Sequence, residues 1–234
     1  PVVVCSLHSM VAPVCAALGR LGGGRLRIVY TMTDGAALPV SFSRTVRTLR
    51  DKNLVEKTIT AGHAFGGDVE AVCKYSALAL AHASLRADAI VVSMGVGVVG
   101  TSSELGNTAL EAAEWINAVH ALGGRPVAAV RIGFSDKRDR HRGISHHART
   151  ALGRLCLAPA AVPVPELDKE KAAVIDTQLS ESGIRERHNV SIEDGDVAIE
   201  AMKEYGLRVT TMGRGVEEEP SFFLSCGAAA RVAY

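Results

Sequence analysis

The chain has 234 residues, of which 47% are hydrophobic and 22% are charged, and this composition excludes a disordered or fibrous protein. The formal net charge of +1 provides no overall basic field, so a nucleic acid or membrane surface would need a local patch to bind. We expect no membrane-spanning helix, because no apolar run reaches about 20 residues, and no signal peptide before the fold. Five scattered cysteines are typical of buried thiols in a reducing compartment, which predicts a cytoplasmic protein.

Short Val- and Ile-rich runs alternate with longer helical patterns, which predicts βα units around a parallel sheet. The expected strands cover residues 2–7, 26–33, 55–62, 88–95 and 126–133. The expected helices lie near residues 10–21, 41–52, 68–86 and 107–122. A sixth strand at 160–166 follows the helix that contains "SHHARTALGRLCL", and its alternating prolines favour a sheet edge.

The rest of the chain, residues 168–234, repeats this pattern more weakly. It contains a charged helix, "HNVSIE", the helix "VAIEAMKEYG", the strand "LRVTTMG" and the Ala-rich tail helix "PSFFLSCGAAARVAY". The tail helix is apolar on most faces, so we expect it to bury against the sheet or against another subunit of a homo-oligomer.

The predicted fold is therefore one α/β domain over residues 1–234, with three layers, a mostly parallel Rossmann-like sheet and helices on both faces. Residues 158–170, which hold three prolines, form a weak internal boundary. Because Pro1 leads straight into the buried-looking strand "VVVCSL", we expect an N-terminal segment to be missing.

The two kinds of turn in this pattern differ in composition. Helix-to-strand turns such as "RDKN" and "LGGRP" hold glycine and surface charge. Strand-to-helix turns are compact and polar or glycine-rich: "SLHSM", "TDGAALPVS", "GHAFGGD", "GVGVVGTSSELGN" and "GFSDKRDRHRGISHH". These turns lie at the carboxyl edge of a parallel sheet, where ligands bind. The sequence predicts one pocket there, lined by His8, Asp34, His63, residues 95–103 and residues 136–147.

The fourth of these turns is a G-x-G-x-x-G motif made by Gly95, Gly97 and Gly100. A dinucleotide fingerprint opens a helix at once and is followed by an acidic residue about 20 positions on. Here "TSSELGN" intervenes and Asp136 comes much later, which disfavours that interpretation. Backbone N–H groups and nearby hydroxyls fit a phosphate or carboxylate, and tight backbone packing explains the glycines equally well. The hydroxyl-bearing residues are Thr101, Ser102 and Ser103.

Single polar residues stand at the ends of the first three strands. Asp34 could orient a ligand hydroxyl, bind a metal or act as a base, although an Asp-Gly pair is also a common turn former. His8 and His63 can exchange protons near neutral pH. Asp68 is expected to cap the helix that follows His63.

The stretch "RHRGISHHAR" at residues 140–149 contains His141, His146 and His147. The last two are adjacent and point about 100° apart on a helix, so they cannot form the i, i+4 pair of a zinc helix. A metal would need His141 or a loop aspartate as a further ligand, and we expect no metal. Nucleic acid is disfavoured, because the basic residues are confined to one loop with interleaved aspartates and no stacking aromatics.

An anion clamp fits this stretch best. Arg138, Arg140 and Arg142 can form forked hydrogen bonds with a phosphate or carboxylate, while His141, His146 or His147 supplies a proton donor. The alternative is a solvated, flexible loop.

The motifs "TDGAALP", "GHAFGGDVEAV", "GVGVVGT" and "RHRGISHH" together resemble an uncharacterised bacterial family, a domain of unknown function in actinobacteria and clostridia-like Gram-positives. The resemblance covers most of the chain. It implies a longer N-terminus and names no reaction.

Three functions are consistent with these residues. The first is an enzyme that acts on a small anionic substrate by general acid–base chemistry or hydrolysis, with an unidentified cofactor requirement. In this hypothesis protons are moved by His63, His141 or His146, and the anion is held by Gly97, Gly100, Thr101, Arg140 and Arg142. The second is a ligand-binding or regulatory homo-oligomer without turnover, and the third is a dinucleotide-dependent oxidoreductase.

Overall fold

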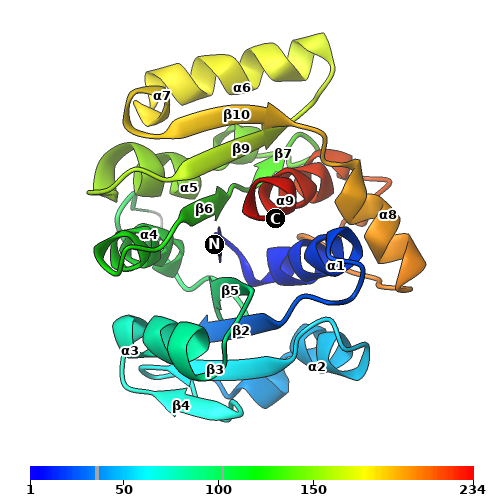
Figure 1. The fold of residues 1–234 in the computed structure, drawn as a ribbon. Helices are drawn as coiled ribbons and strands as arrows, with labels where there is room; N and C mark the ends of the chain where they lie inside the picture. Colours follow the sequence, from blue (N-terminus) through cyan, green and yellow to red (C-terminus); the bar gives the residue numbers. More distant parts are fainter. Residues whose placement is uncertain (35–36, 102) are drawn as a thin grey trace.

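The computed structural model describes residues 1–34, 37–101 and 103–234. Within these residues a parallel sheet is covered by helices on both faces, which confirms the predicted three-layer α/β fold (Figure 1). The eight strands of this sheet follow the spatial order β10-β9-β6-β1-β5-β2-β3-β4. Their bounds are β1 Val2–Cys5, β2 Ile28–Thr33, β3 Lys57–Ala61, β4 Val69–Ala71, β5 Ala89–Met94, β6 Pro126–Ala129, β9 Ala161–Pro165 and β10 Asn189–Glu193. A separate antiparallel pair is formed by β7 Ile132–Gly133 and β8 Gly143–Ile144.

The helices divide between the two faces of the sheet. In Figure 1, α1, α2, α8 and α9 lie on one side and α3, α4 and α5 on the other. Their bounds are α1 Val11–Leu21, α2 Arg44–Asp51, α3 Lys74–Ala79, α4 Glu111–Ala121, α5 His146–Thr150, α6 Lys169–Glu181, α7 Ile184–Arg187, α8 Asp196–Glu204 and α9 Pro220–Ala233. Short 3₁₀ turns are η1 His8–Met10, η2 Val40–Phe42, η4 Thr108–Leu110 and η5 Asp139–His141, and α3 and α5 continue into the π-helical turns η3 Leu80–Ser84 and η6 Ala151–Leu155.

Each central strand contributes to two apolar cores because both of its faces are covered. Val3 and Val91 pack into the core beneath α1, whereas Val4 and Val92 pack into the core beneath α4. This is why the central strands are continuous runs of Val and Ile rather than alternating patterns.

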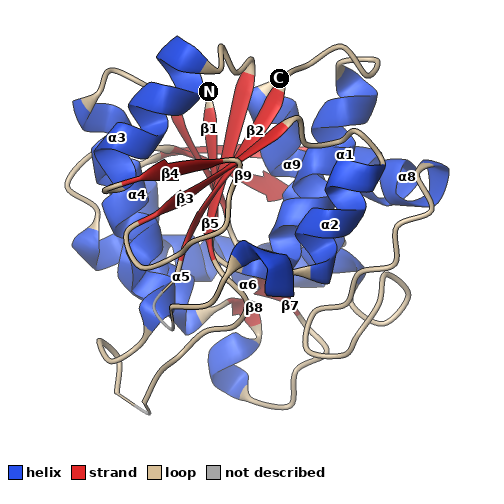
Figure 2. Cartoon of the chain, turned by 90° about the horizontal axis from the view of Figure 1, so that it is seen from below, coloured by secondary structure: helices blue, strands red, loops and turns tan. Residues whose placement is uncertain are grey.

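The strands of the eight-stranded sheet are all parallel, but the connections between successive strands reverse their direction along the sheet between β1 and β5. These strands are hydrogen-bonded neighbours, yet the chain leaves β1 for α1 on one face and leaves β5 for α4 on the other. Connections that depart to opposite faces leave a crevice at the carboxyl ends of the two strands, where ligands of open α/β sheets bind. Figure 2 shows long loops and the β7–β8 pair at this end of the sheet, away from the N-terminus.

Part of the expected helix at 68–86 is a strand. Residues Val69–Ala71 form β4 beside β3, and the helix begins only after Cys73, its N-cap residue. Asp68 is therefore not a helix cap. Its carboxylate accepts hydrogen bonds from the backbone and hydroxyl of Thr58 and forms an ion pair with Arg50, which ties β3 to the start of β4.

The proline-containing strand β9 lies between β6 and β10, so the predicted edge position is wrong. Ala160 and Glu166 hydrogen-bond to β10, which shows that even-numbered residues face that neighbour. Because odd-numbered residues then face β6, Pro163 and Pro165 remove no N–H group from the β10 ladder. On the β6 side the pairing stops at Ala161, before the prolines begin.

The C-terminal region departs from the prediction at one element. Residues 207–213, expected as a strand, form a loop with an isolated bridge between Thr211 and Arg214, and they lie over the carboxyl edge of the sheet. The tail helix α9 buries within the chain, against α1, α8, β6 and β9, as one of the two expected alternatives. None of the helices in the described residues is long and apolar enough to cross a membrane.

Candidate functional site

A cavity of about 810 Å³ opens at the switch point between β1 and β5. It is lined by the turn after β1, the glycine-rich loop after β5, residues of the 131–147 segment and the 208–212 loop. We call it the basic cavity, because no aspartate or glutamate occurs among its described lining residues, which include Arg44, Arg131, Arg138, Arg140 and Arg208. Five guanidinium groups around one crevice, of which only Arg131 and Arg138 form a described ion pair, concentrate positive potential there.

A buried aspartate beneath the cavity orients part of this arginine cluster. The Asp136 carboxylate, with a side chain 6% exposed, lies 3.0 Å from Arg138, 3.2 Å from Arg214 and 3.5 Å from Arg131. Hydrogen bonds from Arg138 hold the pKa of Asp136 well below its ordinary value. Asp136 is therefore ionised at neutral pH and fixes the guanidinium groups around it.

Arg131 in turn determines which ring nitrogen of His141 carries the proton. Its guanidinium nitrogen lies 3.0 Å from His141 Nδ1, and since arginine can only donate, Nδ1 must be the unprotonated acceptor. The proton of the neutral ring is then on Nε2. Burial and the charges of Arg131 and Arg138 lower the pKa of His141 to about 4. His141 is thus held as a neutral hydrogen-bond donor rather than as a base.

His146 and His147 complete a cluster of three imidazoles with His141. Their ring centroids lie 3.9 Å apart, and that of His146 lies 5.0 Å from that of His141. Burial and nearby arginines lower the pKa of His146, and burial together with His146 lowers that of His147 to about 4. His146 Nε2 is buried and has no hydrogen-bond partner in the described structure. A neutral imidazole is the form required of a general base.

The 131–147 segment that carries these groups is anchored at both ends. The buried carboxylate of Glu219, just before α9, accepts the N–H groups of Phe134 and Ser135, each at 2.9 Å. Gln178 on α6 accepts the N–H of Ile144 at 2.7 Å. Ser145 then caps α5 by accepting from the backbone of Ala148. The histidines therefore stand on an anchored turn and a helix start rather than on a free surface loop.

His8 lies at the cavity wall within a directed hydrogen-bond chain. Ser93 donates to the Met94 carbonyl, so the Tyr30 hydroxyl must donate to Ser93 at 2.8 Å. His8 Nδ1 then donates to Tyr30 at 3.1 Å, and Nε2 accepts from Ser43 at 2.7 Å. Burial lowers the pKa of His8 to about 4. Both of its ring nitrogens are thus engaged inside the protein.

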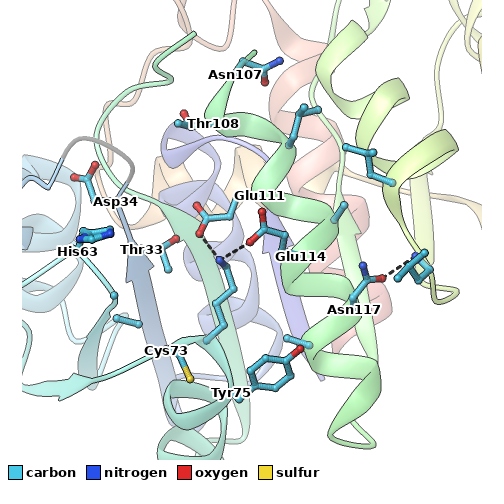
Figure 3. Close-up of a pocket in the computed structure, with 18 of the residues that line it drawn as sticks. Thr33, Asp34, His63, Cys73, Tyr75, Asn107, Thr108, Glu111, Glu114 and Asn117 are labelled. Carbon is cyan, nitrogen blue, oxygen red and sulfur yellow. Dashed lines mark hydrogen bonds and ion pairs between the residues drawn. The ribbon is translucent and has the colours of Figure 1, made fainter. Parts of the chain in front are cut away.

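A second cavity of about 1000 Å³ lies beside the basic cavity, between the ends of β2 and β3 and the helices α3 and α4. We call it the side cavity. Figure 3 shows Asp34 and His63 at the strand ends on one side and Glu111 and Glu114 on α4 on the other. Both glutamates contact the Lys74 ammonium at 2.8 Å. The side cavity is therefore richer in carboxylates than the basic cavity.

The side cavity also holds the one cysteine that departs from the buried pattern among the described residues. Cys73 is exposed, and hydrogen bonds from Ser76 lower the pKa of its thiol. The other four cysteines are buried, as expected.

The predicted site residues are thus distributed over two cavities. The basic cavity contains His8, Gly97, Gly100, Thr101, Arg140, His141, His146 and His147. Asp34 and His63 line the side cavity. Gly95 lies against Asp34, and Arg142 is exposed with its guanidinium 5.9 Å from the ring centre of Phe134, so neither lines the basic cavity. Ser102 lies outside the described residues.

Sequence reasoning missed several residues of the basic cavity. Arg131 sits in the apolar run "AAVRIG", and a charged residue inside a buried strand was the available signal for it. Arg208 was hidden because its segment was taken for a strand, and Arg44 because it opens an ordinary helix. In the described parts of the chain, no group of three or more His, Cys, Asp or Glu side chains has the arrangement to hold a metal ion.

Comparison with known proteins places the chain in a family. A search of curated proteins and a search of solved structures each gave no match. A family model described as a protein of unknown function, DUF3866, matches residues 1–230, which confirms the resemblance inferred from the motifs. With nearly its whole length matched, the chain belongs to the DUF3866 family.

Proposed function

We propose that the basic cavity binds a small molecule through its phosphate or carboxylate group and that the protein catalyses proton transfer on this ligand. The observation that carries the proposal is the cavity's position and charge: it lies at the β1–β5 switch point, and arginines with no described carboxylate line it. Guanidinium groups bind such anions through paired, charge-assisted hydrogen bonds.

The three clustered histidines support a division of roles in the reaction. His141 is neutral and carries its proton on Nε2, because Nδ1 accepts from Arg131, and it donates this N–H to the ligand. His146, a neutral ring that lines the cavity, acts as the general base. Ligand binding adds negative charge beside these rings and raises their pKa values toward neutral pH, where a general acid–base group is most effective.

The role of the arginines is tested by titration with inorganic pyrophosphate at low ionic strength. Arg140→Gln should weaken binding about tenfold, the value of one charge-assisted hydrogen bond. Arg142→Gln is the matched control, because Arg142 is in the same loop, carries the same charge and does not line the cavity. Equal losses in the two variants, or no binding by the wild-type protein, would refute the assignment.

Catalysis is tested separately from binding. Native mass spectrometry of the purified protein identifies a co-purified ligand, whose turnover is then followed in the wild type and in His146→Gln. We expect the variant to keep binding and to lose turnover at least a hundredfold. Binding without turnover in the wild type would instead favour the ligand-binding or regulatory module.

A further inference from the structure

The end of β5 is shaped around the carboxylate of Asp34. Strands β2 and β5 are paired so that Thr33 lies opposite Met94, which makes Asp34 and Gly95 the next residues of two neighbouring strands. A Cβ atom on Gly95 would stand 2.8 Å from Asp34 Oδ2. Any larger residue at position 95 would therefore displace the carboxylate.

The remaining glycines of the motif have two further geometries. Gly97 has a φ of +104°, no atom lies within 4 Å of the place of its missing Cβ, and it lines the basic cavity. Gly100 packs closely on Asn107. Gly95 thus makes room for the Asp34 side chain, Gly97 leaves open space over the basic cavity, and Gly100 permits close packing.

This is the spatial arrangement by which nucleotide-binding sheets hold a ribose phosphate. In such sheets a glycine-rich turn approaches the phosphate, while an acidic residue at the end of the neighbouring strand binds the ribose hydroxyls. Chain order differs here, since Asp34 precedes the glycine-rich turn instead of following it. A ligand contacts residues according to their positions in space. The order of the strands in the sequence therefore does not prevent the sheet from binding a ribose phosphate in the same way.

The two cavities provide the space that such a ligand needs. Asn107, which packs on Gly100, lines both of them, so the two cavities lie side by side next to the glycine-rich loop. The Asp34 carboxylate is oriented by the N–H of Leu38, which donates to Oδ2 at 2.9 Å. A carboxylate accepts hydrogen bonds from the hydroxyl groups of a ligand as well as from backbone N–H groups.

We propose that the ligand is a ribose phosphate, as found in nucleotides, with its phosphate in the basic cavity and its ribose hydroxyls on Asp34. This inference rests on the proposed function, because it places the phosphate among the same arginines. The phosphate is held by guanidinium groups rather than by a helix N-terminus, since residues 101–107 separate the glycines from η4.

The test compares ADP with 2′-deoxy-ADP by calorimetric titration of the intact chain. Removing a hydroxyl that a buried carboxylate recognises should weaken binding about tenfold or more. Asp34→Asn should abolish this difference and leave the affinity for inorganic pyrophosphate unchanged. Glu114→Gln, which removes an exposed carboxylate of the same cavity, should change neither. The same comparison with ribose 5-phosphate and its 2-deoxy analogue shows whether a sugar phosphate suffices or the base is needed.

The outcomes separate this inference from the proposed function. Pyrophosphate binding with equal affinities for ADP and 2′-deoxy-ADP overturns the ribose assignment and leaves the anion site standing. Failure of both pyrophosphate and ADP to bind overturns both proposals. If Asp34→Asn does not fold, the wild-type ratio of the two affinities still decides, because it requires no variant.

Discussion

Removal of the Asp136 carboxylate tests how the basic cavity is held together. In Asp136→Asn the side chain keeps its size and loses its charge. Arg131, with a side chain 7% exposed, would then remain buried without its ion-pair partner, whereas Arg138 and Arg214 are 45% and 26% exposed and regain water more easily. Breaking a buried ion pair costs about 3–5 kcal/mol. Because two of the three cations are partly solvated, we expect a loss of about 3 kcal/mol in the free energy of unfolding.

Urea denaturation followed by fluorescence measures this loss directly. The single tryptophan, Trp115, is buried in α4 and reports on unfolding of the core. Asp139→Asn is the matched control, since Asp139 lies in the same loop and is exposed. We expect the control to change stability by no more than about 0.5 kcal/mol. A loss below about 1 kcal/mol in Asp136→Asn, equal to that of the control, would refute the argument.

The pH dependence of the same difference provides an independent check. The pKa of Asp136 in the folded state lies below its ordinary value of 3.8, so its contribution to stability is present above that pH. As the pH falls below 3.8 the carboxylate of the unfolded chain takes up a proton first, and the wild type loses this advantage. The gap between the wild type and Asp136→Asn should therefore narrow in that range. A gap that stays constant would show that charge is not its cause.

Three further expectations concern single positions. Arg131→Met should raise the pKa of His141 from about 4 toward 6.5 in an NMR titration, and the wild-type ring should show the Nε2–H tautomer; an unchanged pKa would contradict the Arg131 contact. Because burial lowers the pKa of His8 from 6.5 to about 4, its contribution to stability falls by about 2 kcal/mol between pH 7 and pH 5. His8→Gln should reduce the loss of urea-measured stability over that range by this amount, while His141 and His147 keep their own contributions. Gly227→Ala should lose about 1–3 kcal/mol, because a Cβ there would collide with the Gly195 carbonyl; unchanged thermal unfolding would contradict this packing.

The fold could be predicted because its central strands are apolar on both faces and its turns are polar on one edge only. Local errors arose where tertiary pairing decides the outcome. Residues 69–71 form an edge strand because they can hydrogen-bond to the otherwise unpaired side of β3. No local sequence pattern indicates that this pairing is possible. Pro163 and Pro165 fit an interior strand because the backbone of odd-numbered residues faces away from β10, so the ladder with β10 needs no N–H group from them. This orientation depends on the register with β10.

The turns that form the candidate site could be predicted from the sequence, but which of these turns lie next to one another could not. The polar residues were correctly assigned to turns at the carboxyl edge, yet the distance between two such turns depends on strand order. In the sheet β5 lies between β1 and β2, so His8 faces the basic cavity while Asp34 and His63 lie beyond β5 in the side cavity. Arg131 and Arg208 were missed because their importance comes from what surrounds them in space.

The same separation of sequence order from spatial order explains why the glycine-rich motif was discounted. Its fingerprint was judged by the acidic residue that follows it along the chain, and Asp136 stands too far away. The sheet brings a different acidic residue, Asp34, to the neighbouring strand end, because the chain forms β2 before it returns to insert β5 beside it. Ligand recognition depends on which strand ends are adjacent. A glycine-rich turn in a parallel sheet should therefore be judged against the carboxylates on both neighbouring strands, including those that precede it in the sequence.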